Sequence, residues 1–299
     1  MTNREPGFQM FDFDLRTNPH ALPGSAPPRI GRYPVNGTTL YAEVRGSGPA
    51  LLLIHAGAED AEEYRAIAER LVEFTVVTYD RRGTFRSGHD EWPGQGSAQH
   101  ADDAAALVSA LGLSNGLVFG ASSGGIVALQ MALRHPDLVR RALIWEPGYL
   151  RHVPGGDEIH RRMSAAGASH LTANPKDWAG AYAAVLRSLA IAPGEAAASG
   201  DPQERTWYDE REDGNAASIL LDDIPILTGE RVDETLLATA IADVRFAYGE
   251  LTRPIFRDVT IHLARVRGTQ PDVIGGVGHG VQYQPETVAA YIRRHGAVA

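Results

Sequence analysis

The sequence predicts an α/β protein in which helices flank a mainly parallel sheet and a helical cap is inserted late in that sheet. Three observations lead to this prediction. Short apolar segments alternate with helical segments over residues 31–146 and again over 241–299, a pattern typical of parallel strands covered on both faces. Residues 147–240 are mostly helical in pattern and rich in alanine. Residues 120–124 form a glycine-rich turn between an apolar strand and a helix.

The expected elements follow from local patterns along the chain. Asn36-Gly37 predicts a two-residue hairpin turn, with strands at 32–35 and 39–44. Continuous apolar or β-branched segments predict further strands at 51–54, 74–79, 117–119, 141–145, 244–248 and 272–274. Helical patterns predict helices at 61–72, 98–111, 126–134 and 285–294.

These elements divide the chain into an arm, a core and a cap. Residues 1–30 are rich in proline and polar residues without periodicity, so we expect an arm that lies on the domain or is partly disordered. The core is expected at 31–146 and 241–299. The cap is expected at 147–240, with an acidic loop at 201–213.

Composition limits the class of function. The net charge is −9 at pH 7, which argues against nucleic acid or an anionic membrane as a partner. The chain has no cysteine, which excludes disulfides, thiolate catalysis and cysteine-ligated metal. No segment has the length of a signal peptide's apolar region or of a membrane helix. We therefore expect a cytoplasmic protein without a membrane partner, and oligomeric state is not encoded in any recognisable pattern.

The turn at residues 120–124 has the pattern Gly-x-Ser-x-Gly. A serine on a tight turn from strand to helix has an exposed side chain and a crowded backbone, and Gly120 and Gly124 remove the Cβ atoms that would clash there. The helix that follows directs free N–H groups and its positive dipole end to the same place, which suits a developing oxyanion. Ser122 is therefore the predicted nucleophile of a serine enzyme.

Four motifs in a fixed order resemble the α/β-hydrolase fold superfamily. They are His-Ala-Gly at 55–57, Asp-Arg-Arg-Gly-Thr-Phe-Arg-Ser at 80–87, the serine turn at 120–124 and Gly-His-Gly at 278–280. The resemblance covers about residues 30–146 and 243–297. It implies a serine-nucleophile member of that superfamily, and the cap expected at 147–240 lies outside the resemblance.

The resemblance also implies the partners of Ser122. His279 lies in a glycine-rich loop before the last helix, where the family keeps its catalytic base. The backbone N–H groups of Ser123 and Gly57 are the expected oxyanion donors, with Ala56 as the alternative to Gly57. His55 is expected to be a structural residue of the oxyanion loop.

The acid of the triad departs from the common family pattern. The family usually places it after the strand expected at 244–248, where this chain has Thr252. Some branches place it after the strand that follows the nucleophile helix, and Glu146 stands there, 24 residues after Ser122. We expect Glu146 to be the acid, and Glu250 and then Asp258 remain alternatives.

The expected reaction is the hydrolysis of an ester or lactone through an acyl-enzyme. It needs no cofactor, and no metal ligands at metal-site spacing occur in the sequence. Halide or epoxide opening on this scaffold needs a carboxylate at position 122, so the serine disfavours it. Carbon–carbon bond hydrolysis or another reaction of the same triad, and a non-catalytic ligand-binding protein, remain alternatives. The apolar side chains of the cap favour a medium-sized hydrophobic substrate.

Overall fold

The computed structural model describes residues 18–189 and 202–296. In this part of the chain, eight strands form one sheet in the order β1-β2-β4-β3-β5-β6-β7-β8. Strands β1 and β2 pair antiparallel, β2 pairs antiparallel with β4, and all other neighbours are parallel. The strands are β1 (Arg29–Val35), β2 (Thr38–Arg45), β3 (Ala50–Ile54), β4 (Thr75–Tyr79), β5 (Gly116–Ala121), β6 (Val139–Trp145), β7 (Asp243–Gly249) and β8 (Asp272–Ile274). The predicted α/β class and mainly parallel sheet are confirmed.

The hairpin at the sheet's edge forms where the sequence predicts it. Val35 pairs with Thr38 across the turn. Asn36 and Gly37 both have positive φ, 42° and 79°. A two-residue turn that follows the twist of its strands needs this left-handed backbone at both central residues, and asparagine and glycine adopt it most readily.

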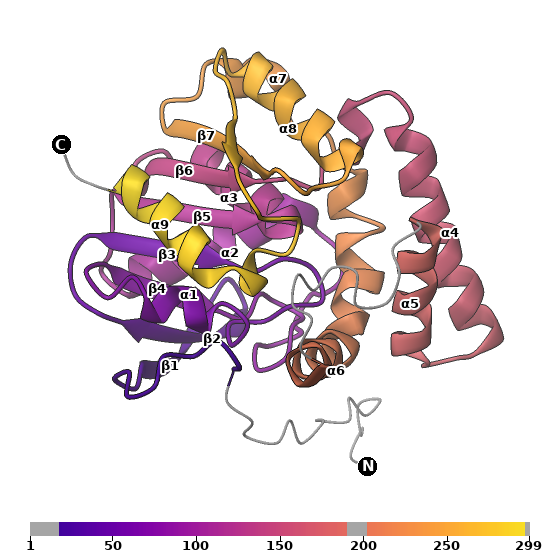
Figure 1. Cartoon of the computed structure of the whole chain (residues 1–299), viewed down its shortest axis with the longest axis horizontal. Coiled ribbons are helices and arrows are strands. Elements are labelled where there is room, and N and C mark those ends of the chain that lie inside the picture. The colour runs from indigo at the N-terminus through magenta and orange to yellow at the C-terminus, as the bar shows by residue number, and fades with distance from the viewer. Residues whose placement is uncertain (1–17, 190–201, 297–299) are drawn as a thin grey trace.

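Helices cover both faces of the sheet (Figure 1). On one face, α1 and α9 pack with apolar residues of β3, β5 and β6. On the other face, α2, α3 and α8 enclose the larger part of the core. The helices are α1 (Arg65–Glu69), α2 (Gly96–Ala110), α3 (Ser122–Arg134), α4 (Gly156–Ala173), α5 (Trp178–Ser188), α6 (Pro202–Ser218), α7 (Glu234–Ala238), α8 (Pro254–Val266) and α9 (Pro285–Gly296).

Three local expectations are wrong. The acidic loop expected at 201–213 is largely helix, because α6 spans Pro202–Ser218. Although the segment is rich in charged residues, one face of the helix is buried and includes Tyr208 and Asn215. The helix expected at 61–72 is reduced to α1 between turns, and α8, which follows β7, was not expected. A proline at its first position favours a helix start there.

The segment between β6 and β7 carries the helices α4, α5 and α6, which stand beside the sheet in Figure 1. We propose that these three helices and the π-helical turn Ile219–Asp223 form the cap expected at 147–240. Farther along the segment, Leu227, Val232 and Leu237 belong to the same hydrophobic cluster as the sheet. The end of the expected cap therefore packs with the core.

The arm expected at 1–30 is described from residue 18 onward, and residues 1–17 lie outside the described part of the chain. The Leu22 N–H donates to Glu69 at 2.7 Å, and the Ser25 hydroxyl donates to the same carboxylate at 2.6 Å. The Asn18 side chain donates to the Glu62 carbonyl at 2.9 Å. The described part of the arm thus lies against α1 and the turn before it, and it joins the sheet at β1, which begins at Arg29.

The carboxyl ends of the parallel strands meet at one edge of the sheet. The chain continues from β3 into His55, from β5 into Ser122 and from β6 into Glu146, and the loops after β7 and β8 hold Thr252 and His279. In open α/β sheets this edge is where ligands bind. Residues far apart in the sequence are brought together there by the parallel topology alone.

Gly124 tests how tightly the serine turn is packed. A Cβ at this position would lie 2.4 Å from the carbonyl oxygens of Ile54 and His55. We expect Gly124→Ala to lower the free energy of unfolding by about 1–3 kcal/mol, as overpacking does elsewhere. Gly94→Ala, where a Cβ meets nothing within 4 Å, should change it by less than about 0.5 kcal/mol. Chemical denaturation of both variants is the measurement, and equal stabilities would contradict this account.

Candidate active site

Ser122 stands at the junction of β5 and α3 with no loop between them. Its backbone is left-handed, with a φ of 53°, a conformation that costs free energy for a residue with a side chain. Gly120 and Gly124 make the junction possible, because a Cβ on Gly120 would lie 2.2 Å from the Gly124 carbonyl oxygen. The strain holds the Ser122 side chain at the cavity rather than along the strand.

Two backbone N–H groups are available beside Ser122. Ser123 is the second residue of α3, and the first N–H groups of a helix have no partner within it. The Ala56 N–H is already bound, because it donates to Glu59 Oε2 at 2.8 Å. Because the Ala56 N–H is engaged, the N–H of the neighbouring Gly57 is the better candidate for the second oxyanion donor. Gly57 lines the cavity.

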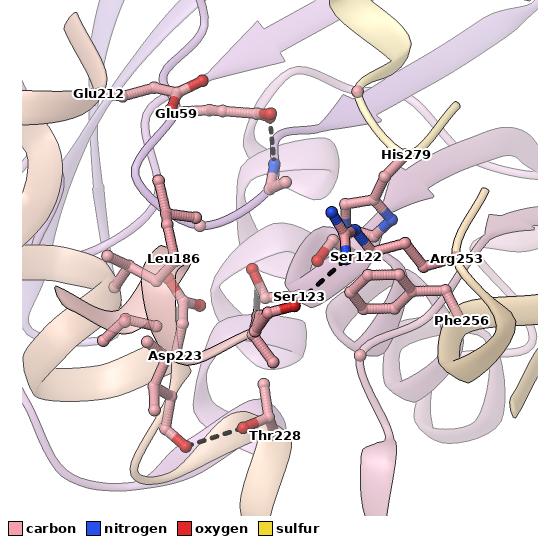
Figure 2. Close-up of a pocket in the computed structure, with 18 of the residues that line it drawn as sticks. Glu59, Ser122, Ser123, Leu186, Glu212, Asp223, Thr228, Arg253, Phe256 and His279 are labelled. Atoms are coloured by element: carbon pink, nitrogen blue, oxygen red, sulfur yellow. Dashed lines mark hydrogen bonds between the residues drawn. The ribbon is translucent and has the colours of Figure 1, made fainter. Parts of the chain in front are cut away.

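His279 and Glu146 are in direct contact. The Nδ1 atom of His279 lies 2.6 Å from Glu146 Oε2. Glu146 is fully buried and has a φ of 42°, so the chain turns sharply at the end of β6 and places the carboxylate under the histidine. The contact fixes Nδ1 as the donor and leaves Nε2 for a second partner. Ser122 and His279 line the same cavity (Figure 2).

The loop after β7 completes the surroundings of Glu146. The Gly249 N–H donates to Oε1 at 2.8 Å, and the Thr252 hydroxyl donates to Oε2 at 2.6 Å. Thr252 occupies the position where the family usually has the acid, and here its hydroxyl donates a hydrogen bond to Glu146. The alternative acids lie apart: Glu250 is exposed and accepts from the Gly276 N–H at 3.2 Å, and Asp258 pairs with Arg257.

Phe256 is a site residue that sequence reasoning missed. Its ring stacks on the His279 ring, with centroids 3.9 Å apart and planes at 17°. Phe256 belongs to α8, the helix that was not expected. A helix prediction after β7 would have directed attention to it, but no motif marks the residue.

His55 has a structural role in the loop after β3, the candidate oxyanion loop. Its Nδ1 atom contacts the Ala56 carbonyl oxygen at 2.8 Å, and its Nε2 atom accepts from the Arg81 N–H at 3.0 Å. Burial lowers the pKa of His55 to about 3, so its ring stays neutral. It ties the loop after β3 to the loop after β4.

A cavity of about 430 Å³ opens above Ser122 and His279. The cap contributes apolar side chains to its wall, among them Met163, Val185 and Leu186. Tyr182 and Leu189 of the same segment also line this cavity. Trp207 and Tyr208 pack with Tyr283 instead.

Two buried ion pairs join the cap to the core beside the cavity. Arg81 donates to both oxygens of Asp223 at 3.0 and 3.1 Å. Arg211 of α6 lies 2.7 Å from each oxygen of Asp60. Loss of one partner would leave a buried charge uncompensated, which typically costs about 3–5 kcal/mol. The π-helical turn that carries Asp223 is therefore held over the oxyanion loop.

Acidic side chains line one end of the cavity. Figure 2 shows Glu59 and Glu212 together, away from Ser122 and His279. Burial raises the pKa of Glu59 to about 7 and that of Glu212 to about 8. Burial also raises the pKa of the neighbouring Glu63 well above its usual range. These carboxyl groups therefore hold protons near neutral pH.

One group of three side chains in the described part of the chain could hold a metal ion. The ligand atoms of His152, Glu234 and His262 lie within 4.8 Å of one another, outside the cavity. Glu234 Oε1 contacts His152 Nδ1 at 3.1 Å and His262 Nε2 at 2.7 Å. The Val232 N–H donates to His152 Nε2 at 3.0 Å, which leaves the proton on Nδ1. A metal ion at Nδ1 needs the opposite tautomer, so the trio fits a hydrogen-bonded cluster better than a metal site.

Comparison with known proteins places the chain in a family. A family model described as the alpha/beta hydrolase fold matches residues 49–159. The putative carbamate hydrolase RutD of Azorhizobium caulinodans is 30% identical over 247 residues, which cover 74% of this chain and 90% of that protein. Since this relative is aligned over nearly its whole length, the chain belongs to the α/β-hydrolase fold family.

Other matches are shorter or more distant. The uncharacterized hydrolase YraK of Bacillus subtilis is 38% identical over 129 residues, so the chain spans about half of YraK's length, 48%, and 42% of the chain is aligned. Among solved structures, that of Est816, described as an N-acyl homoserine lactone degrading enzyme, has a TM-score of 0.67 at 21% identity. It covers 88% of this chain and 99% of its own. A likeness at this identity concerns the fold alone.

None of the described helices combines the length and the apolar character that crossing a membrane requires.

The raised pKa values predict a pH dependence of stability. Glu212 binds its proton more tightly in the folded than in the unfolded chain, facing Glu59, Asp209, Tyr182 and Tyr283. Its contribution to stability is therefore full below about pH 4.5 and is lost as the pH rises through about 8. The free energy of unfolding should fall across this window by about 1.4 kcal/mol per pH unit for each such proton.

Glu212→Gln should flatten this slope, whereas Glu158→Gln, at an exposed position of α4, should retain it. Urea denaturation at several pH values between 5 and 9 measures the slope. The same slope in Glu212→Gln and in the unaltered protein would show that Glu212 does not hold the proton.

Proposed function

We propose that this protein is a serine hydrolase that cleaves an ester or lactone of a medium-sized hydrophobic substrate through an acyl-enzyme. The observation that carries the proposal is the 2.6 Å contact between His279 and the buried Glu146, at a cavity that Ser122 also lines. Family membership supports a hydrolytic reaction, and the serine at position 122 supports acyl transfer.

In the proposed mechanism, His279 Nε2 takes the proton of Ser122 as its oxygen attacks the carbonyl carbon. Glu146 holds the imidazole in the required tautomer and stabilises the positive charge that the ring gains. The N–H groups of Ser123 and Gly57 receive the negative oxygen of the tetrahedral intermediate. The protonated His279 then gives its proton to the leaving oxygen as the bond between that oxygen and the carbonyl carbon breaks. A water molecule, deprotonated by His279, attacks the acyl-enzyme, which releases the acid and restores the Ser122 hydroxyl.

Two similar proteins support the choice of the bond that the enzyme cleaves, and the cavity wall supports the kind of group attached to it. Est816, which shares the fold, is described as degrading N-acyl homoserine lactones, so a lactone fits this scaffold. RutD is described as a putative carbamate hydrolase, and a carbamate carbonyl could be attacked by the same serine. The apolar cap wall favours a hydrophobic acyl or alcohol group over a short acetate ester.

Labelling with a fluorophosphonate tests the nucleophile. We expect one adduct, located on Ser122 by peptide mapping, because the reagent reacts with a serine that a base has activated. Ser122→Ala and His279→Ala should each abolish both labelling and ester turnover while circular dichroism remains unchanged. A folded protein that gives no adduct, or an adduct on another serine, would contradict the proposal and favour a non-catalytic ligand-binding role.

A matched pair of substitutions tests the acid. Glu146→Gln removes the negative charge beside His279 and should lower the turnover number by about 10⁴, the size of the corresponding effect in serine proteases. Glu250→Gln makes the same chemical change at an exposed residue without contact to His279 and should leave turnover within about twofold. Steady-state kinetics on a nitrophenyl ester measures both, and the reverse result would identify Glu250 as the acid.

A further inference from the structure

The acidic end of the cavity has no part in the proposed hydrolysis. Glu59 and Glu212 line it, and both are drawn together in Figure 2. Glu59 uses Oε2 to accept the Ala56 N–H, and the Tyr64 hydroxyl also lies close to its carboxyl group. Glu212 accepts from the hydroxyls of Tyr182 and Tyr283 at 3.2 and 3.3 Å.

A third acid, Glu63, is buried near these two. Glu63 is fully buried, and neither of its carboxyl oxygens has a hydrogen-bond partner among the described residues. The charges that act on it most strongly are those of Glu59 and Glu212. A buried carboxyl group without a partner costs about 1–3 kcal/mol or more, so a native site that keeps one calls for an explanation.

Two arginines beside the cavity are engaged with other acids. Arg81 is bound on two sides to Asp223, and Arg211 contacts both oxygens of Asp60. Each of these arginines is balanced by its own carboxylate. The end of the cavity therefore gathers carboxyl groups whose pKa values are raised by burial, to about 7 for Glu59 and about 8 for Glu212, and well above the usual range for Glu63.

An organic cation fits this end better than a metal ion. Among the described residues, the only acidic and histidine ligand atoms that converge in a group of three are those of His152, Glu234 and His262. The oxygens of Glu59, Glu63 and Glu212 are too far apart to share a small ion. The hydroxyls of Tyr182 and Tyr283 contact Glu212, and both tyrosines line the cavity. Aromatic side chains together with carboxylates are the usual surroundings of alkylammonium groups.

We propose that the Glu59–Glu212 end of the cavity is a subsite for a positively charged amine, and that the preferred substrates are hydrophobic esters or lactones that carry an organic ammonium group. This inference rests on the proposed function for its substrate class, but the subsite itself is a matter of binding. The ammonium group supplies the charge that the carboxyl groups lack, and its arrival displaces a proton from them.

Binding is tested on Ser122→Ala with a pair of isosteric amides. The probes are the N-butyl amides of 4-(trimethylammonio)butanoic acid and 5,5-dimethylhexanoic acid, which differ in one nitrogen for one carbon. We expect the cationic amide to bind at least about tenfold more tightly by calorimetry, with release of a proton that depends on the buffer. Glu212→Gln in the same background should reduce the ratio to about one, and Glu158→Gln should retain it.

The unaltered protein is then given the 4-nitrophenyl esters of the same two acids. A higher kcat/KM for the cationic ester, by about the same factor as the binding ratio, is expected. Equal affinities, tighter binding of the neutral amide, or no binding of the cationic amide would each overturn the subsite. Hydrolysis of neither ester, with the binding ratio intact, would instead overturn the proposed function and leave the subsite standing.

Discussion

The proposed site depends on the hydrogen bonds that the buried carboxylate of Glu146 accepts. It receives the Gly249 N–H, the Thr252 hydroxyl and His279 Nδ1, and so joins the ends of β6 and β7 to the loop after β8. A buried carboxylate is stable only when such donors satisfy it. Because two of these donors come from the end of β7 and the turn after it, and the third from the loop after β8, the position of His279 is fixed by the same bonds that stabilise the charge.

Backbone strain at two neighbouring strand ends serves the same arrangement. Ser122 and Glu146 both have positive φ, 53° and 42°, and they follow the paired strands β5 and β6. Ordinary residues pay for this conformation with free energy, and the packed glycines of the serine turn make it attainable. Each side chain is thereby turned out of its strand and toward the edge where the carboxyl ends meet.

The described charged residues between the proposed cap and the core fall into paired and unpaired groups beside the cavity. Arg81–Asp223 and Arg211–Asp60 are balanced pairs that fix the cap over the oxyanion loop. Within the described residues, Glu59 and Glu212 form no such ion pair, and burial raises their pKa values to about 7 and about 8. The cavity therefore has apolar cap side chains in its wall and acidic side chains at the end away from Ser122. This division accounts for both the hydrophobic and the cationic features of the proposed substrate.

The sequence alone determined the elements whose cause is local. Apolar segments predicted the strands, Asn36-Gly37 predicted the hairpin, and Gly120, Ser122 and Gly124 predicted a strained turn. Only the tertiary structure decided what depends on distant partners. It put Glu146 rather than Glu250 in contact with His279, stacked Phe256 on that ring, and made a helix of the acidic segment 202–218 by burying one face of it. The physical reason is that the role of a carboxylate depends on the donors and charges around it. These groups come from strands that are neighbours in the sheet but far apart in the sequence.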